Sequence, residues 1–328
     1  MADLPVSNAP ASEQGALARA AQARLARTVN LAPDFGTPLE QGWTFDLQRS
    51  HLEACAQSGF TAIRLLMYLT AHRTPAGLDA GMLSRVEQIV DDATALGLGV
   101  VIANHRDPEL IAHPDSKLPA TLAGVTELAG VFAGRGAGLV LEPLAEPEQG
   151  LDPIWNTVAA ELIGAVRDRD QHRTILLGPR TMNNARFLGE LALPEAERNL
   201  IVGIHHYWPV TFTMQGELWL GEDHVFGHPR DWLGTTWDQT PGQEAELRAG
   251  FDQVAGWGAM TGRPLFLAEF GTTSHADLAS RVRWTRFNRG LAEERGLPWA
   301  VWSFAPIFAI YDLSACAFNP ELLAALMD

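Results

Sequence analysis

The sequence predicts an α/β fold, a (β/α)8 TIM barrel. Short apolar, β-branched runs alternate with longer segments whose apolar residues recur at intervals of three and four, which is typical of βα units around a parallel sheet. Eight such runs are present, and most begin roughly 25 to 40 residues apart, about the length of one βα unit. No glycine-rich phosphate turn follows the first run, which disfavours the competing doubly wound sheet.

The eight runs are the predicted strands. In chain order they cover residues 28–31, 61–64, 99–103, 138–141, 174–177, 200–204, 264–268 and 298–302. Segments with helical periodicity separate them at 47–58, 83–96, 122–133, 154–169, 244–261 and 279–294. This alternation predicts one barrel domain over residues 1–328.

Two regions depart from the repeat. Residues 1–14 are rich in Pro, Ser and Asn and predict a loose N-terminal leader. The strands that begin at 200 and 264 are separated by a longer interval, which predicts an aromatic-rich loop insertion over about 208–240. It contains Trp208, Trp219, Trp232 and Trp237. We expect at least half of these to pack the loop onto the barrel and one or two to line a substrate cleft.

Charge and composition exclude several classes of function. Lys and Arg number 24 against 39 Asp and Glu, a net charge of −15, so nucleic acid and anionic membranes are not expected partners. No stretch approaches the ~20 apolar residues of a membrane span, and no signal-peptide pattern is visible. A removed leader would leave no trace, so the location stays open. Cys55 and Cys316 define neither a disulfide framework nor a metal site.

Polar or aromatic residues close most of the apolar runs. Catalytic groups of such barrels lie at the C-terminal ends of the strands, so this set is the candidate active site. It comprises Arg64, His105, Glu146, His205, Tyr207, Glu269 and Trp302, with Asn104 as an alternative to His105.

Two carboxylates stand out in this set. Glu146 and Glu269 follow strands four and seven, so they face each other across the barrel mouth. Such a pair suits glycoside hydrolysis, in which one carboxyl protonates the leaving oxygen and the other attacks the anomeric carbon. A Trp at the barrel floor offers an apolar face to a sugar ring.

The strand-end motifs resemble those of glycoside hydrolase family 5, a family of retaining (β/α)8 glycosidases. The motifs occur in the family's order between Asn30 and Asp312: Gly59-Phe-Thr-Ala-Ile-Arg64, Leu141-Glu-Pro-Leu-Ala-Glu-Pro147, His205-His-Tyr207, Leu267-Ala-Glu-Phe-Gly271 and Trp299-Ala-Val-Trp-Ser-Phe304. The resemblance implies that Glu146 is the general acid/base and Glu269 the nucleophile. It also implies that His205 and Tyr207 support them and that Arg64 lies beneath the nucleophile.

One position departs from the family pattern. Ala145 stands where the family has an Asn that binds the sugar 2-hydroxyl beside the acid/base. The smaller side chain predicts space for a substrate that is substituted or linked through O2. The competing hypothesis is that another side chain or a water replaces the contact and the substrate is an ordinary β-glucan. Arg106 adds a cation near this point, and Glu142 is expected to pair with a barrel cation.

The sequence therefore predicts a retaining β-glycosidase that acts on a β-linked oligo- or polysaccharide through a covalent glycosyl-enzyme, with carbohydrate as its partner. No cofactor is implied, and no metal is expected, because His206, His224 and His228 follow no zinc pattern. The alternatives are a transglycosylase with the same residues and a carbohydrate-binding protein with weakened catalysis. We expect the two carboxyl groups about 5 to 5.5 Å apart and the pKa of Glu146 raised by the charge of Glu269.

Overall fold

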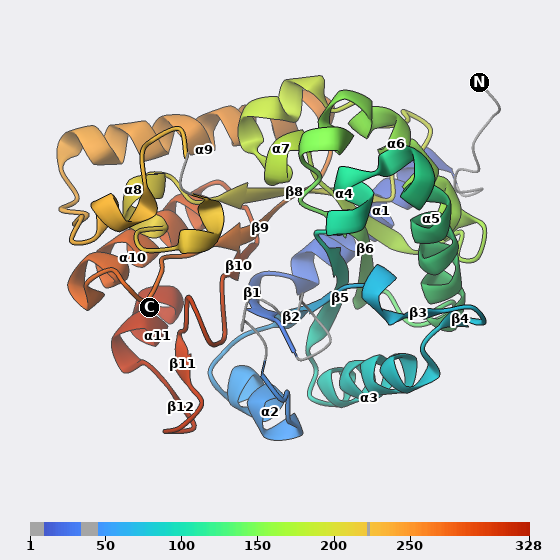
Figure 1. The fold of residues 1–328 in the computed structure, drawn as a ribbon, viewed down its shortest axis with the longest axis horizontal. Helices are drawn as coiled ribbons and strands as arrows, with labels where there is room; N and C mark the ends of the chain where they lie inside the picture. The colour runs from blue at the N-terminus through green and yellow to red at the C-terminus, as the bar shows by residue number, and fades with distance from the viewer. Residues whose placement is uncertain (1–9, 34–44, 222–223) are drawn as a thin grey trace.

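The computed structural model describes residues 10–33, 45–221 and 224–328. Eight parallel strands form a closed barrel in the order β1-β10-β9-β8-β7-β6-β5-β2 (Figure 1). They are β1 (Arg27–Leu31), β2 (Ala62–Met67), β5 (Gly99–His105), β6 (Leu139–Ala145), β7 (Thr174–Leu177), β8 (Leu200–His206), β9 (Leu265–Phe270) and β10 (Trp299–Val301). All eight predicted strands are present, and the predicted (β/α)8 barrel is confirmed.

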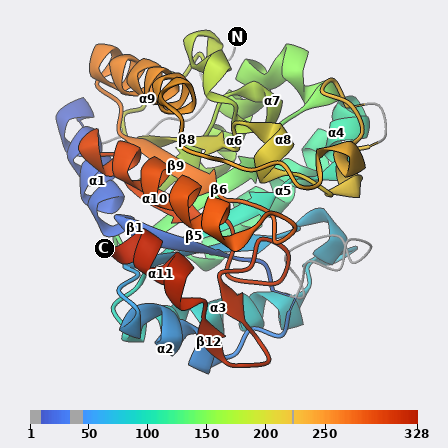
Figure 2. The ribbon, with the colours of Figure 1, turned by 90° about the vertical axis from the view of Figure 1, so that its left-hand side faces the viewer.

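Helices surround the barrel in both ribbon views (Figures 1 and 2). They are α2 (Arg49–Gln57), α3 (Ala80–Ala95), α4 (Pro108–Ala112), α5 (Pro114–Val131), α6 (Trp155–Arg167), α9 (Pro241–Thr261), α10 (Leu278–Glu294) and α11 (Pro320–Met327). Side-chain caps fix several starts: Asp79 accepts from Met82 N, Asp277 from Ser280 N, and Thr240 forms a capping box with Gln243. None of the helices in the described ranges combines the length and apolarity that a membrane span needs.

Two small hairpins extend from the barrel. Strands β3 (Arg73–Thr74) and β4 (Gly77–Leu78) form one, and β11 (Tyr311–Asp312) and β12 (Ala317–Phe318) form the other. Both are antiparallel and lie outside the barrel sheet. They do not change the order of the eight barrel strands.

The N-terminal helix α1 (Ala11–Arg24) closes one end of the barrel. Ala18, Ala21 and Leu25 are buried in one cluster with side chains of the barrel interior, including Val140 and Phe266. The predicted leader is therefore wrong for residues 11–14, which form the first turn of α1, whereas residues 1–9 lie outside the described ranges. Small alanines supply the buried face of this helix, so its apolar periodicity is weak in the sequence.

The loop after β8 contains short helices rather than an unstructured excursion. These are α8 (Val210–Thr213), η5 (Leu218–Leu220) and η6 (Pro229–Trp232). Trp232 and Trp237 are buried, while Trp208 and Trp219 line the cavity described below. As expected, half of these tryptophans pack the loop onto the barrel and the other two line a cleft.

Candidate active site

A cavity of about 790 Å³ opens where the barrel strands end. Six of the eight predicted site residues line it: His105, Glu146, His205, Tyr207, Glu269 and Trp302. They come from the ends of β5, β6, β8 and β9 and from the residue that follows β10. The parallel topology brings these distant residues to one rim, as the barrel argument predicts.

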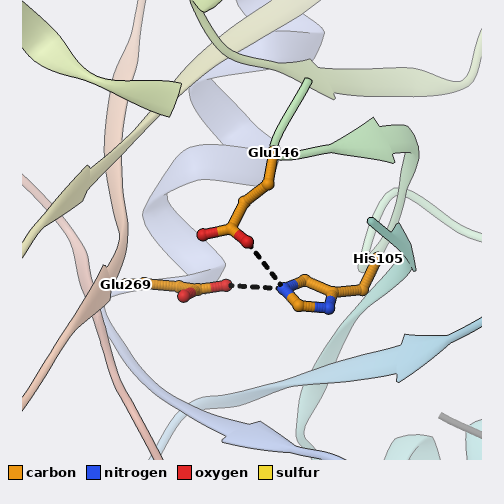
Figure 3. Close-up of side chains that lie close together, drawn as sticks. All are labelled: His105, Glu146 and Glu269. Carbon is orange, nitrogen blue, oxygen red and sulfur yellow. Dashed lines mark ion pairs between the residues drawn. The ribbon is translucent and has the colours of Figure 1, made fainter. Parts of the chain in front are cut away.

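The two carboxylates point toward each other across the cavity, and His105 points at both (Figure 3). One carboxylate oxygen of Glu146 and one of Glu269 lie within 4.8 Å of each other. The Nε2 atom of His105 lies 3.4 Å from Oε2 of Glu146 and 3.8 Å from Oε1 of Glu269. The predicted pairing of the carboxylates across the barrel mouth is therefore present.

Glu269 is held by a buried cation and a phenol. Arg64 Nη1 donates to its Oε1 at 2.7 Å, and the Tyr207 hydroxyl donates to its Oε2 at 2.8 Å. Burial, followed by the charges of Glu269 and Glu146, raises the pKa of Tyr207 well above its usual value. Tyr207 therefore keeps its proton and acts as a hydrogen-bond donor to Glu269.

Arg64 lies beneath Glu269 rather than in the cavity. It is fully buried, and its Nε also donates to Glu142 at 2.6 Å while Nη1 donates to Asn30. Burial alone would lower the pKa of Arg64, but the carboxylates of Glu142 and Glu269 raise it above its usual range. Because β2 continues to Met67, the prediction that Arg64 closes its strand is wrong. As a candidate substrate-binding residue Arg64 is also misplaced, since it does not line the cavity, whereas the place beneath Glu269 that the resemblance implies is where the structure has it.

Glu146 has histidine partners instead of a fixed cation. His205 Nδ1 lies 2.9 Å from Oε1, and His105 approaches Oε2. Burial would raise the pKa of Glu146, but above all the hydrogen bonds with His105 and His205 outweigh it and hold the pKa well below the usual value. The expected upward shift is thus wrong, because hydrogen bonds from two close imidazole nitrogens outweigh the effect of burial.

The backbone at Glu146 is left-handed, with φ of 54°. Its N–H donates to Oδ1 of Asn183 at 3.0 Å. Asn183 belongs to the turn α7 (Arg180–Asn183), where Thr181, Met182 and Asn183 have φ of 57°, 58° and 54°. Side chains other than glycine adopt this region at a cost of about 1–3 kcal/mol each, so the surrounding structure must impose it.

Ala145 does not form part of the cavity wall. It is fully buried and pairs with His105 across the β6–β5 ladder. It is absent from the residues that line the cavity, so the prediction of a substrate contact at Ala145 and of open space beside it is not met in this conformation. An O2 substituent would require its neighbours to move.

His105, not Asn104, is the β5 residue that reaches the carboxylates. Asn104 is buried, accepts a hydrogen bond from Leu69 N at 3.1 Å and donates to Pro143 O at 3.1 Å. Its amide links the segment after β2 to strand β6. Of the two alternatives at this position, only His105 lines the cavity.

The expected cation at the mouth is neutralised. Arg106 Nε donates to Oε1 of Glu148 at 2.7 Å, and both residues line the cavity. The pair presents a polar but uncharged wall next to Glu146. Sequence inspection did not select Glu148, since a lone acid after a strand is usually a solvated loop residue.

Aromatic side chains form other walls of the cavity. Trp302 stacks on His105 with ring centroids 5.7 Å apart, and Trp208 packs edge-on against Phe226 at 5.6 Å. Trp208 is 37% exposed, and Trp219 donates its indole N–H to Glu217 at 2.8 Å. Exposed aromatic faces in a cleft with a few polar groups are suited to stacking with sugar rings.

His105, Glu146 and Glu269 are the group in the described ranges whose ligand atoms are close enough for a metal ion. Both oxygens of Glu269 already accept from Arg64 and Tyr207, and the Arg64 cation lies directly behind it. The three histidines at 206, 224 and 228 do not form such a group in the described part of the chain.

The strands also contain a residue that sequence inspection missed. Asn30 is fully buried on β1, accepts from Arg64 and donates to Ala268 O and Val301 O. The sequence does contain an indication of this role, because a polar residue inside an apolar strand must find hydrogen-bond partners when it is buried. Asn183 carries no comparable signal, because it lies in a loop whose left-handed backbone is not visible in the sequence.

Comparison with models of known protein families shows which family the chain belongs to. The family model for cellulase, glycosyl hydrolase family 5, matches residues 31–306. The chain belongs to glycosyl hydrolase family 5. The resemblance inferred from the strand-end motifs is thereby confirmed.

Individual members of family 5 resemble the chain over most of its length. Endoglucanase H of Acetivibrio thermocellus is 25% identical over 309 residues, which covers 91% of this chain and 32% of that protein. Cellulase/esterase CelE of the same organism is 24% identical over 330 residues, which covers 91% of this chain and 39% of CelE. The chain thus spans about a third of the length of these curated relatives.

Solved structures in the family agree with the fold. Thermotoga maritima Cel5A in complex with cellobiose superposes with a TM-score of 0.88 at 29% identity, covering 94% of this chain and 99% of that one. The cellulose synthase subunit Z of Clostridioides difficile gives a TM-score of 0.85 at 27% identity, covering 92% and 99%.

Proposed function

We propose that this family 5 member is a retaining β-glycosidase that hydrolyses β-linked glucans, with Glu269 as nucleophile and Glu146 as general acid/base. The observation that carries the proposal is the approach of their carboxylate oxygens to within 4.8 Å. Retaining enzymes hold their carboxyl groups about 5–5.5 Å apart, whereas inverting enzymes need about 6.5–9.5 Å to admit a water.

In the first step, Glu269 attacks the anomeric carbon and Glu146 gives its proton to the glycosidic oxygen. The C1–O bond breaks, the leaving sugar departs as an alcohol, and a glycosyl ester forms on Glu269. Arg64 and Tyr207 donate to the two oxygens of Glu269, so they orient the attacking carboxylate. Trp302 supplies the stacking face for the sugar at this position.

In the second step, the ionised Glu146 takes a proton from water, and the water oxygen attacks C1 and releases Glu269. Glu146 is suited to both roles because a bound sugar can displace its contact with His105. When a sugar occupies the gap between the carboxylates, the glycosidic oxygen replaces His105 beside Oε2, and loss of that donor raises the pKa of Glu146.

A β-1,4-glucan is the proposed substrate class. The relatives are named endoglucanases or cellulases, and the solved Thermotoga maritima Cel5A complexes contain cellobiose or mannotriose. The burial of Ala145 favours an unsubstituted sugar over the O2-linked alternative. The transglycosylase and binding-protein alternatives gain no support from any feature of the cavity.

The test is hydrolysis of soluble β-1,4-glucan, β-1,4-mannan, β-1,3-glucan and β-1,2-glucan, with reducing ends measured and the first anomer followed by proton NMR. We expect activity on β-1,4-glucan with the β-anomer formed first. Matched Glu146→Gln and Glu269→Gln variants exclude a contaminating activity. Initial release of the α-anomer, or no hydrolysis of any β-glucan, would contradict the proposal.

A further inference from the structure

Three hydrogen bonds form a ring that begins and ends on Glu146. Its backbone N–H donates to Asn183 Oδ1 at 3.0 Å, Asn183 Nδ2 lies 3.5 Å from His205 Nε2, and His205 Nδ1 lies 2.9 Å from Glu146 Oε1. Asn183 is fully buried and is not among the residues that line the cavity. Any effect it has on chemistry therefore passes through Glu146 and His205.

The direction of every bond in this ring follows from one fixed donor. A backbone N–H can only donate, so the Asn183 atom facing Glu146 N is the carbonyl oxygen. The Asn183 amide nitrogen then faces His205, and because an amide N–H can only donate, His205 Nε2 must accept. The imidazole proton consequently resides on Nδ1 and is donated to Oε1 of Glu146.

The fold constrains the backbone to place Asn183 here. The left-handed turn at Thr181 and Met182 is held by Asp152, which accepts from Thr181 N at 2.8 Å and from its hydroxyl at 3.0 Å, and by Met182 N donating to Pro147 O. Gly178 provides the room, since a Cβ there would lie 2.5 Å from Cγ and Nδ2 of Asn183. Three hydrogen bonds and a glycine thus hold the left-handed turn that places Asn183 beside Glu146 and His205.

We propose that Asn183 is a positioning residue that selects which oxygen of Glu146 carries the transferred proton. With Oε1 accepting from His205 Nδ1–H, the acidic proton of Glu146 resides on Oε2. That oxygen is the one beside His105 Nε2, in the gap between the two carboxylates where the glycosidic oxygen must sit (Figure 3). This role rests on the proposed function of Glu146 as general acid.

The kinetic test uses the leaving group, because protonation matters for a sugar leaving group and hardly at all for a dinitrophenolate. Asn183→Ala should lower kcat/KM for a cello-oligosaccharide by about 10- to 100-fold, but that for 2,4-dinitrophenyl β-cellobioside by less than about threefold. Asn183→Asp keeps an acceptor for Glu146 N–H and removes the donor to His205, so it should show the same selective loss. Equal losses on both substrates, or none, would overturn the proposal.

Asn199 supplies a matched control. It is equally buried, accepts from the Thr174 hydroxyl at 2.8 Å and donates to His172 O at 2.9 Å, at the opposite end of the barrel strands. Asn199→Ala should lower thermal stability without any dependence on the leaving group. Asp152→Ala, which loosens the turn but leaves Asn183 in place, should give a weaker form of the Asn183→Ala pattern.

The decisive experiment needs no turnover. In protein labelled with ¹⁵N-histidine, the resonances of His205, assigned with His205→Gln, report which ring nitrogen carries the proton. The expected result is a protonated Nδ1 and an unprotonated Nε2 in the unmodified protein, and loss of that single tautomer in Asn183→Asp. A proton on Nε2 in the unmodified protein would refute the proposed ring even if glucan hydrolysis is confirmed, whereas the expected tautomer without hydrolysis would refute the function alone.

Discussion

The two carboxylates of the site differ in backbone, exposure and the charge of their partners. Glu269 lies within strand β9, its side chain is 3% exposed, and the permanent cation of Arg64 donates to it. Glu146 lies on left-handed backbone, its side chain is 13% exposed, and its contacts are two histidines and an asparagine amide. Both histidines also approach Glu269, at 3.8 Å for His105 and 3.5 Å for His205, so the difference lies in Arg64, whose permanent charge pairs with Glu269 and not with Glu146.

This difference matches the chemistry proposed for each group. A nucleophile must be ionised when the substrate arrives and again when the glycosyl ester is released, and a buried arginine favours its ionised form. A general acid that later acts as a base must change protonation within each cycle, which requires neighbours that a substrate can displace.

Replacing the nucleophile should have the largest effect. Glu269→Gln keeps the shape of the side chain but removes the attacking oxygen, so kcat on β-1,4-glucan should fall by on the order of 10⁴-fold or more. Binding of cello-oligosaccharides, measured by calorimetry, should remain. Near-normal turnover would assign the nucleophile to another residue.

Removing the permanent cation of Arg64 should have the second largest effect. Arg64→Met leaves Glu142 and Glu269 buried without their cation, so we expect a loss of about 3–5 kcal/mol in the free energy of unfolding together with loss of activity. Chemical denaturation and kcat on the folded fraction measure the two effects. Arg167, equally buried and paired with Glu197 at 2.7 Å, is the matched control. Arg167→Met should lose similar stability while the folded fraction keeps its kcat.

Replacing His105 should shift the basic limb of the pH profile of kcat/KM. In kcat/KM, the basic limb reports loss of the Glu146 proton, and His105 helps hold the pKa of Glu146 below its usual value. His105→Gln should therefore raise this pKa and shift the basic limb upward, by about one pH unit. His172→Gln, remote from the cavity, should leave the limb in place. A downward shift would contradict the assigned direction.

The smallest effect is expected at the cleft wall. Trp208→Ala removes an exposed stacking face worth about 0.5–1.5 kcal/mol, which should raise KM for long glucans about two- to tenfold with kcat almost unchanged. Leu313→Ala, at an exposed apolar residue outside the cavity lining, is the control. A large fall in kcat for Trp208→Ala would show that the residue positions the reacting sugar.

The sequence predicted the barrel because each strand combines a β-branched apolar run with a following helix, and parallel topology then brings the strand ends together. His105, Glu146, His205, Tyr207, Glu269 and Trp302 were found for this reason. Arg64 was misplaced because its strand continues beyond it, and helix α1 was missed because alanines form its buried face. Asn183 was invisible because a backbone of positive φ, supported by Asp152 and by the absence of a Cβ at Gly178, is a property of tertiary structure.

The central claim is that Glu269 forms the covalent bond to sugar while Glu146 does not. Incubation with 2,4-dinitrophenyl 2-deoxy-2-fluoro-β-cellobioside, whose fluorine slows breakdown of the glycosyl ester, followed by peptide mass spectrometry, tests it directly. We predict one fluorocellobiosyl group on the peptide that contains Glu269, and none in Glu269→Gln. A label on Glu146 or Glu142, or release of dinitrophenol without any labelled peptide, would contradict the account.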